Sequence, residues 1–563
     1  MVQVRPFLII ACLSALLTPY AGSAFAQPIP GSADIDQIKP AQRNRLAPKV
    51  EDSPNYIPSP LTPDTPPPPQ AKDIMALLKE IHVEGVTVFS PAEVEAIYKP
   101  YLGKEVPLDT VWKVAAALTA KYRDAGYFLS RAYIPAQEVD NGVFLIKVVE
   151  GYIGKVDVGG PASDNPIITK ALDRIMALKP VNVRMLEREL LLLNDLPGLT
   201  FQSTLAPLED DDEASVLMVL KTDDLPATAV ASIDNAGSRY LGPYQMSASW
   251  EFSALELQHT AITAMTSLFG KELYALSLLH KIMVSSDTSI DLDASRSNAT
   301  PGYTLKPQEI RSRSTQAGIG VSHKFIRQRD MNLSAGVSLD MRNSDSDILG
   351  FVLSRDRTRV MNIDVNYDLA DPWHGYNYFV VNMRRGIDGF GSSDAGDLDI
   401  SRTGAKPDFF KTQVSYTRLQ GIGTHWSGML SLAGQKSSGS LYSSEEFGYG
   451  GTVFGRAYDN SEISGDDGVA ASVELRYQGV PNWNNITFNP YAFYDVGKVW
   501  NNNIGQPDAI SGSSAGIGLY FQYNSALSGN LYAAQPLTKP VDTPLNGGNG
   551  HNPRYMVQVS YKF

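Results

Sequence analysis

From about residue 225 to the end, apolar and polar side chains alternate along the chain with a period of two. The run 331–342 shows the pattern, because its polar or small positions alternate with Met331, Leu333, Ala335, Val337, Leu339 and Met341. The run 361–369 repeats it, with Met361, Ile363, Val365, Tyr367 and Leu369 on one face. Successive side chains of a strand point to opposite sides, so this period predicts β-strands with one apolar face.

Two architectures accommodate such strands, a soluble sandwich and a membrane barrel. In a sandwich the apolar face points into a core, whereas in an outer-membrane barrel it faces lipid and the polar face lines a wet lumen. The polar face here carries many charged and amide groups, such as Asp340, Arg342 and Asn362, which favours the lumen. Residues 225–563 leave room for about 16 antiparallel strands at roughly 20 residues per strand and turn. We therefore predict a transmembrane β-barrel.

The last ten residues continue the alternation to the end of the chain. Their apolar positions are Tyr555, Val557, Val559, Tyr561 and the terminal Phe563. A closing strand that ends on an aromatic residue resembles the signal that the barrel-assembly machinery recognises. Phe563 is thus the candidate C-terminal signal, and that machinery and outer-membrane lipid are expected partners.

Residues 73–224 have a helical period instead and divide into two units of the same order, β-α-α-β-β. In the unit 73–151 we expect strands at 80–89, with a break at Gly85, at 129–134 and at 143–150, with a helix opened by Ser90-Pro91-Ala92-Glu93 and a second helix at 108–125. A serine cap, a proline and a carboxylate in this order are a helix-start signal. In the unit 152–224 we expect strands at 153–158, 199–206 and 214–221 and helices at 167–178 and 183–193.

The N-terminus is typical of a secretory signal peptide. Arg5 precedes the apolar run 7–17, and Ala24-Phe25-Ala26 is a small-x-small cleavage site before Gln27. A membrane anchor is the alternative, but the run is too short to span a bilayer and Pro19 interrupts it. We predict cleavage after residue 26, which removes the only cysteine, Cys12. A proline-rich linker (27–72) follows, in which 32–46 is a candidate for a short plug helix broken at Pro40.

Composition narrows the function classes. The net charge of −12 argues against nucleic-acid binding, which usually needs a basic surface. Beyond the signal, the chain has no apolar run of the length that a spanning helix needs. The acidic run 209–213 is interpreted as a turn, because a calcium loop needs spaced ligands and a glycine. The seven histidines form no zinc motif and no serine lies in a nucleophile elbow, so we predict no enzyme, no metal site and no cofactor.

Several segments resemble one known family. The segments 126–137 (GYFLSRAYIPAQ) and 148–151 (VVEG) are similar to a POTRA domain of the two-partner secretion transporters, of the hemolysin secretion/activation type in the Omp85 superfamily. The segment 193–198 (LNDLPG) resembles the second POTRA domain of that family, and 325–333 (FIRQRDMNL) resembles a segment of its barrel. The resemblance covers nearly all of the mature chain.

The two most specific matches lie near the C-terminus. Phe454-Gly455-Arg456-Ala457-Tyr458, followed by a segment that ends in Gly465-Asp466, resembles the family's loop with a Val-Arg-Gly-aromatic tip. Phe493-Tyr494-Asp495-Val496-Gly497 matches its Phe-x-Asp-x-Gly strand. This chain departs from the loop pattern, because Ala457 stands where glycine is usual.

The resemblance implies that this loop folds back into the barrel and that Asp495 holds Arg456. A guanidinium inside a barrel is expected to take a carboxylate partner, and the glycines at 448, 450 and 451 allow the loop to turn inward. The alternative is that Arg456 is one more charged residue of the lumen wall.

The function implied by the resemblance is secretion through the bacterial outer membrane. POTRA domains in the periplasm would capture an unfolded exoprotein that carries an N-terminal secretion domain, and the barrel would pass it to the cell surface. No ATP site is evident. Two alternatives remain, an Omp85-type insertase for other barrels and a passive channel. The identity of the exoprotein and its fate after export stay open.

Overall fold

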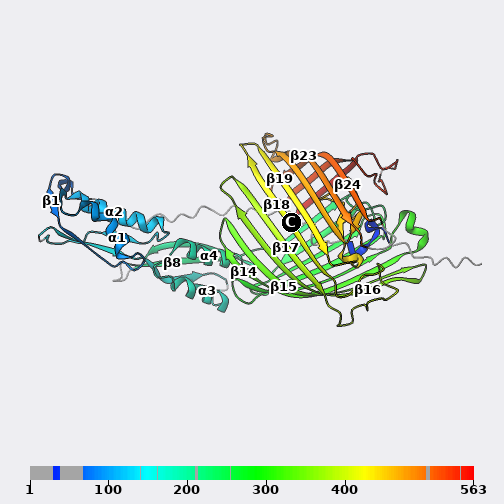
Figure 1. Cartoon of the computed structure of the whole chain (residues 1–563), viewed down its shortest axis with the longest axis horizontal. Coiled ribbons are helices and arrows are strands. Elements are labelled where there is room, and N and C mark those ends of the chain that lie inside the picture. Colours follow the sequence, from blue (N-terminus) through cyan, green and yellow to red (C-terminus); the bar gives the residue numbers. More distant parts are fainter. Residues whose placement is uncertain are drawn as a thin grey trace, which may run out of the picture.

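The computed structural model describes residues 29–37, 67–139, 141–161, 163–208, 214–253, 255–502, 507–545 and 547–563. The signal peptide predicted at 1–26, most of the linker, and the acidic run 209–213 lie outside these residues. The described chain forms a barrel and, beside one of its ends, two smaller α+β units in a row (Figure 1). Among the described residues, none of the helices has the length and apolarity needed to cross a membrane.

Sixteen antiparallel strands close the barrel, as the sequence predicts. They are β9 (Thr228–Asp234), β10 (Gln245–Phe252), β11 (Gln258–Ser267), β12 (Leu273–Met283), β13 (Thr288–Ala299), β14 (Arg311–Arg327), β15 (Met331–Ile348), β16 (Phe351–Ala370), β17 (Gly375–Gly386), β18 (Phe410–Ile422), β19 (Trp426–Ser437), β22 (Asp467–Tyr477), β23 (Ile486–Trp500), β24 (Ala509–Tyr523), β25 (Leu527–Pro536) and β26 (Arg554–Lys562). Closure pairs β26 with β9 over five positions, Gln558 to Lys562. Neighbouring β15 and β16 pair over eighteen.

The alternation along the strands separates the two faces of the barrel wall. Val337 on β15 is 51 % exposed and pairs with Ile363 of β16 on the outside. Asp340, of opposite parity, points into the lumen, where its carboxylate lies 3.4 Å from the Arg384 guanidinium of β17. The outer wall is therefore an apolar surface and the inner wall carries paired charges, which is the arrangement of an outer-membrane barrel.

The first unit departs in detail from the predicted order. It contains β1 (Met75–Leu78), β2 (Glu80–Glu84), α1 (Pro91–Tyr98), β3 (Lys104–Pro107), α2 (Asp109–Asp124), β4 (Arg131–Tyr133) and β5 (Val143–Val149). The strand predicted at 80–89 ends at Glu84, at the break expected at Gly85, which takes a left-handed backbone conformation, and 86–89 do not continue it. The β1–β3 ribbon was not predicted. The capping box of Ser90 and Glu93 opens α1 as the sequence predicts.

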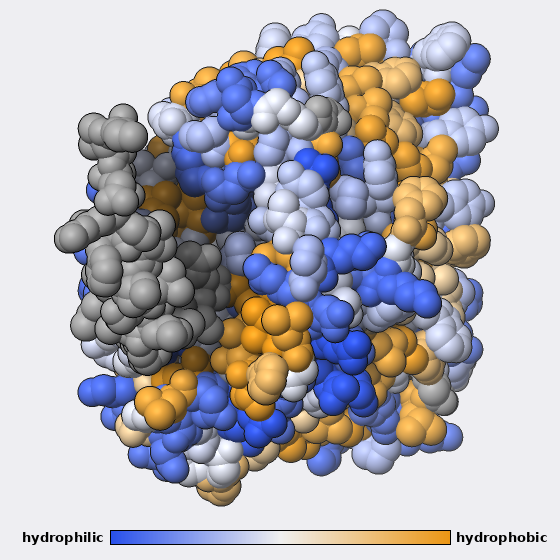
Figure 2. All heavy atoms as spheres, turned by 90° about the vertical axis from the view of Figure 1, so that its right-hand side faces the viewer, coloured by the Kyte–Doolittle hydropathy of each residue, from blue (hydrophilic) through white to orange (hydrophobic). Residues whose placement is uncertain are grey.

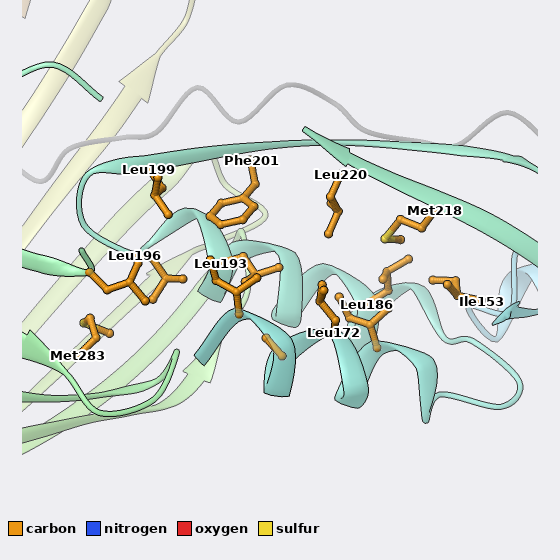
Figure 3. Packing of buried hydrophobic residues seen from close by; sticks show 14 of the residues in the cluster. Ile153, Leu172, Leu186, Leu193, Leu196, Leu199, Phe201, Met218, Leu220 and Met283 are labelled. Carbon is orange, nitrogen blue, oxygen red and sulfur yellow. The ribbon is translucent and has the colours of Figure 1, made fainter. Parts of the chain in front are cut away.

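The second unit has the predicted order, with β6 (Tyr152–Gly159), α3 (Pro166–Met176), α4 (Val183–Asn194), β7 (Leu199–Pro207) and β8 (Ser215–Asp224). Its hydrophobic core includes two residues of the barrel. Leu257 and Met283, from turns at the end of the barrel nearest the units, pack with Leu193 and Leu196 at the end of α4 (Figure 3). Burial of such side chains stabilises the contact between this unit and the barrel mouth.

An ion cluster fastens the same contact. The Asp195 carboxylate, just after α4, accepts hydrogen bonds from Arg327 Nε and Nη2 at 2.7 and 2.8 Å and from Lys324 Nζ at 2.7 Å. Burial raises the pKa of Asp195, but the hydrogen bond from Arg327 and the charge of Lys324 outweigh it and hold the pKa below its ordinary value. Two segments that resemble the family, 193–198 and 325–333, thus meet here.

We expect Asp195→Ala to weaken the docking of the second unit by about 2 kcal/mol, because it removes hydrogen bonds to two charged groups. Spin labels on the second unit and on the barrel would report a broader distance distribution, whereas Asp157→Ala, at an exposed position, should leave the distribution unchanged. In the unaltered protein the contribution is complete above the ordinary carboxyl pKa of about 4 and is lost as the pH falls below it. A distribution equally narrow in Asp195→Ala would contradict the assignment.

Candidate functional site in the barrel lumen

The connection between β19 and β22 (residues 438–466) folds into the lumen. It contains a short hairpin of β20 (Phe447–Tyr449) and β21 (Ile463–Gly465), which packs against β22, β23 and β24. Gly450 has a φ of 121°, and a Cβ there would lie 2.0 Å from the carbonyl oxygen of Asp459. Only glycine fits this close approach of the two arms, so the glycine cluster serves the inward turn of the loop.

Arg456, at the tip of this loop, is 4 % exposed. Its Nε and Nη2 donate to the Asp495 carboxylate of β23 at 3.1 and 2.9 Å, and its backbone N–H donates to the same carboxylate at 3.0 Å. Nη1 donates to Glu474 of β22, and the guanidinium stacks 3.6 Å above the Phe493 ring. Asp495 binds this guanidinium at two points and Glu474 binds it from the other side. The two carboxylates compensate the charge of a buried side chain.

The glycines and aromatic residues of the two motifs form the packing around Arg456. A Cβ on Gly455 or on Gly497 would lie 2.7 or 2.2 Å from the Tyr449 ring, so both glycines make room for that side chain. Tyr458 is fully buried, and its hydroxyl donates to the carbonyl oxygens of Ser513 and Lys539 at 3.1 and 2.9 Å. Phe454 is half-buried against the same cluster, and the buried Ala457 fills the place of the family's glycine.

Asp466, at the end of the loop, does not meet Arg456. Its carboxylate binds the Arg402 guanidinium, which is 2 % exposed and comes from the 387–409 connection between β17 and β18. Arg402 Nε also lies 3.1 Å from a Glu446 carboxylate oxygen, and Nη1 donates to the Leu441 carbonyl at 2.8 Å. A second buried guanidinium therefore ties two long connections together. A Cβ on the neighbouring Gly465 would lie 2.8 Å from the Trp500 carbonyl oxygen.

The segment 29–37 lies inside the barrel, toward the end away from the two units (Figure 1). The Asp36 carboxylate accepts hydrogen bonds from the hydroxyls of Ser314 and Ser344 at 2.6 and 2.7 Å, and Ala33 and Ile35 pack on Tyr240. A helix was predicted at 32–46, of which 38–46 lie outside the described residues. The described part contains two 3₁₀ turns, Gly31–Ala33 and Ile35–Gln37. Asp34 separates the turns, since its side chain accepts from the Asp36 N–H.

The segment 29–37 and the inward loop touch each other. Asn460 Nδ2 donates to the Gln37 carbonyl at 3.1 Å, and a Cβ on Gly31 would lie 2.3 Å from the Ser461 carbonyl oxygen. Seen from the end away from the units, hydrophilic and hydrophobic side chains are mixed across the barrel (Figure 2). The N-terminal segment and the loop thus occupy the lumen together.

The remaining candidates lie apart from this cluster. Phe563 ends the chain on the outer wall, 75 % exposed, with its ring edge-on to Tyr561 and its N–H donating to the Ala229 carbonyl of β9. Within the described ranges, no group of three or more His, Cys, Asp or Glu side chains is placed to hold a metal ion. Sequence reasoning missed Glu474 and Arg402, because neither lies in a motif and each meets its partner across strands or loops.

A sixteen-stranded barrel with two α+β units at one mouth, and with a loop held inside by buried ion pairs, is the architecture of an outer-membrane transporter. The family model described as haemolysin secretion/activation protein ShlB/FhaC/HecB matches residues 213–519, and the model of the ShlB-type POTRA domain matches residues 76–151. The chain belongs to this haemolysin secretion/activation family. It is a protein of the outer membrane whose POTRA domains lie in the periplasm.

Relatives and solved structures of the same kind cover most of the chain. The heme/hemopexin transporter protein HuxB of Haemophilus influenzae (strain 86-028NP) is 23 % identical over 482 residues, which are 80 % of this chain and 81 % of HuxB. The outer membrane transporter CdiB of Dickeya dadantii (strain 3937) is 22 % identical over 82 % of this chain and 83 % of its own. The structure of CdiB from Escherichia coli has a TM-score of 0.69 at 21 % identity and covers 90 % of this chain and 94 % of its own. At that identity the structural likeness speaks for the fold.

Replacing Arg456 by alanine should release the inward loop, because Glu474 and Asp495 then lose their common counter-charge. Breaking a buried pair in this way costs about 3 kcal/mol. We expect faster protease cleavage in 450–462 and a larger ion conductance in planar bilayers, with Lys271→Ala in an exposed turn as the unchanged control. Adding Glu474→Gln and Asp495→Asn should recover part of the stability. Unchanged cleavage and conductance would show that Arg456 does not hold the loop and is only one more charged residue of the lumen wall.

Arg402→Ala should separate the 387–409 connection from the inward loop without touching Arg456. We expect increased proteolysis in 387–409 and a smaller rise in conductance than for Arg456→Ala, since the deeper pair is kept. Arg402→Lys keeps the charge but cannot bind the Asp466 carboxylate at two points, so its effect should be intermediate. Unaltered behaviour of the lysine variant would show that the charge alone, and not the forked contact, matters.

Proposed function

We propose that this chain passes a cognate large exoprotein through the outer membrane, with the POTRA domains capturing the polypeptide in the periplasm. Family membership carries the proposal, and the lumen geometry supports it. The lumen is occupied by a loop and an N-terminal segment, which contact each other there. Such a barrel needs a specific event to open, and an arriving substrate supplies one.

Capture has a structural basis in the sheets of both POTRA domains. The first domain has the sheet β2-β5-β4 and the second has β6-β8-β7, so each has two edge strands. An extended polypeptide can add to such an edge as a further strand through main-chain hydrogen bonds, with little demand on its sequence. This suits an unfolded exoprotein, whose N-terminal secretion domain would be the part that is recognised.

Opening would require the segment 29–37 and the inward loop to leave their places. The segment is held by the Asp36 carboxylate, which accepts from two serine hydroxyls and lies 3.5 Å from Arg342 Nη1, by the Asn460 hydrogen bond and by a few apolar contacts. The loop is held by two charge clusters. We infer that the N-terminal segment leaves first, because its one ion pair, Arg342 with Asp36, is long and single, whereas two buried guanidinium groups hold the loop through two-point contacts. The plug role of 27–72 is part of this proposal.

Biogenesis and the protein's surroundings supply the other expected partners. The exposed terminal Phe563 suits recognition by the barrel-assembly machinery before the barrel is inserted. The apolar outer wall suits lipid. An insertase for other barrels is the second candidate, because the Omp85 fold is shared, whereas a passive channel is disfavoured by the occupied lumen.

Deleting the gene in its host tests the proposal. We expect the exoprotein encoded beside it to disappear from the cell surface and the medium, while the levels of other folded outer-membrane barrels stay normal. The wild-type gene should restore export, and Lys271→Ala should do so equally well. Normal export combined with defective assembly of other barrels would favour the insertase, and no change in either would contradict both roles.

A further inference from the structure

The outer wall of the barrel carries a concentration of arginines on the strands from β13 to β17, all of which except β15 contribute at least one. Residues of one parity on these strands face outward, together with exposed apolar side chains such as Ile319 on β14 and Met361 on β16. The outward residues include Arg296, Arg311, Arg313, Arg355, Arg357, Arg359 and Arg385. The outward carboxylates among them are Asp345 and Asp347. This is a strongly basic patch on a chain whose net charge is −12.

The patch lies at one level of the barrel, the border that faces away from the POTRA domains. On β13 the outward residues run from Leu292 and Ala294 to Arg296, away from the turn that contacts the second POTRA domain. In the same direction Arg385 follows Met383 on β17, Arg359 follows Met361 on β16, and on β14 Arg313 follows Ala317 and Thr315. The arginines thus mark the upper edge of the lipid-facing band, where the headgroups of the outer leaflet lie.

Neighbouring protein groups compensate only part of this charge. Arg357 Nη2 lies 2.6 Å from Asp345, Arg355 lies 3.9 Å from the same carboxylate, and Arg359 donates to backbone carbonyls of the 387–409 connection. Arg296, Arg313 and Arg385 are exposed, and in the part of the chain that the structure describes their guanidinium groups make no ion pair. The same connection carries Asp388, Asp394, Asp397, Asp399 and Asp408, and Glu309 lies just before β14. Asp399 offers its carbonyl to the Arg355 N–H.

We propose that Arg296, Arg313 and Arg385 form a binding surface for the phosphate groups of an outer-leaflet glycolipid. A guanidinium presents two parallel donors that match a phosphate, which explains the use of arginine rather than lysine. The acyl chains would lie on the exposed apolar side chains directly below, including Ile319 and Val321 on β14. That continuity of an apolar wall with a cationic edge fits an amphiphile and not a free anion. The surface is independent of the exported substrate.

The test uses the purified full chain in detergent and native mass spectrometry. The probes are a bis-phosphorylated, multiply acylated diglucosamine lipid and the same lipid without its phosphates. The triple variant Arg296→Gln, Arg313→Gln, Arg385→Gln is compared with a control that removes three charges elsewhere, Lys155→Gln, Lys271→Gln, Lys498→Gln. We expect the triple variant to bind the phosphorylated lipid about tenfold more weakly, the control to match the parent, and the dephosphorylated lipid to bind all three proteins alike.

Three results would overturn the proposal. One is unchanged binding of the phosphorylated lipid by the triple variant. Another is an equal loss of both lipids, which would assign binding to the apolar wall alone. The third is displacement of the lipid from the parent by millimolar inorganic phosphate. Should the glutamine variant fail to fold, as judged by heat-dependent gel mobility, the corresponding lysine variant decides: a partial loss confined to the phosphorylated lipid supports the surface, and no loss overturns it.

Discussion

A guanidinium buried inside a barrel must be compensated, and this constraint organises the lumen. Arg456 meets Asp495 and Glu474 from two adjacent strands, so the loop that carries it can rest in one place only. The glycines at 455 and 497 and the ring of Tyr449 then follow as packing around a fixed charge. An exposed ion pair would stabilise the loop little. A buried one fixes the position of the loop, because breaking it leaves an uncompensated buried charge at a high cost in free energy.

The second cluster extends this control to the rim. Arg402 draws the 387–409 connection onto Asp466 and Glu446, and the loop between the two guanidinium groups touches the N-terminal segment through Asn460. Three segments that are far apart in sequence therefore support one another. One long ion pair and a few polar contacts hold the N-terminal segment, whereas two buried guanidinium groups with two-point contacts hold the loop, so the loop resists release more strongly. At the other mouth, the shared core and Asp195 make the second POTRA domain continuous with the barrel.

Periodicity was sufficient to predict the barrel, because a lipid-facing wall imposes alternation on every strand. It was also sufficient for the element order of the second POTRA domain. It failed at β1 and β3, whose pairing joins Met75–Leu78 to Lys104–Pro107 across an intervening helix. The pairing of Arg456 with Asp495 was expected from family resemblance, and its geometry follows from the register of β22 and β23. The roles of Glu474 and Arg402 could not be predicted. Glu474 meets Arg456 from a neighbouring strand and Arg402 meets Asp466 from a distant loop, and neither residue lies in a local sequence motif. The role of these residues in export stays a prediction.

The ring is also unequal around its circumference. Five paired positions close β26 on β9, against eighteen between β15 and β16, so the cohesion of the wall is concentrated on one side and thin at the junction of the first and last strands. A cylinder of this kind has a built-in seam. During insertion, the strands with long ladders can associate first and the ends of the sheet can join last. Any outward stress on the finished wall, whether from a wide cargo or from bilayer strain, is then relieved at that junction before it reaches the long strands.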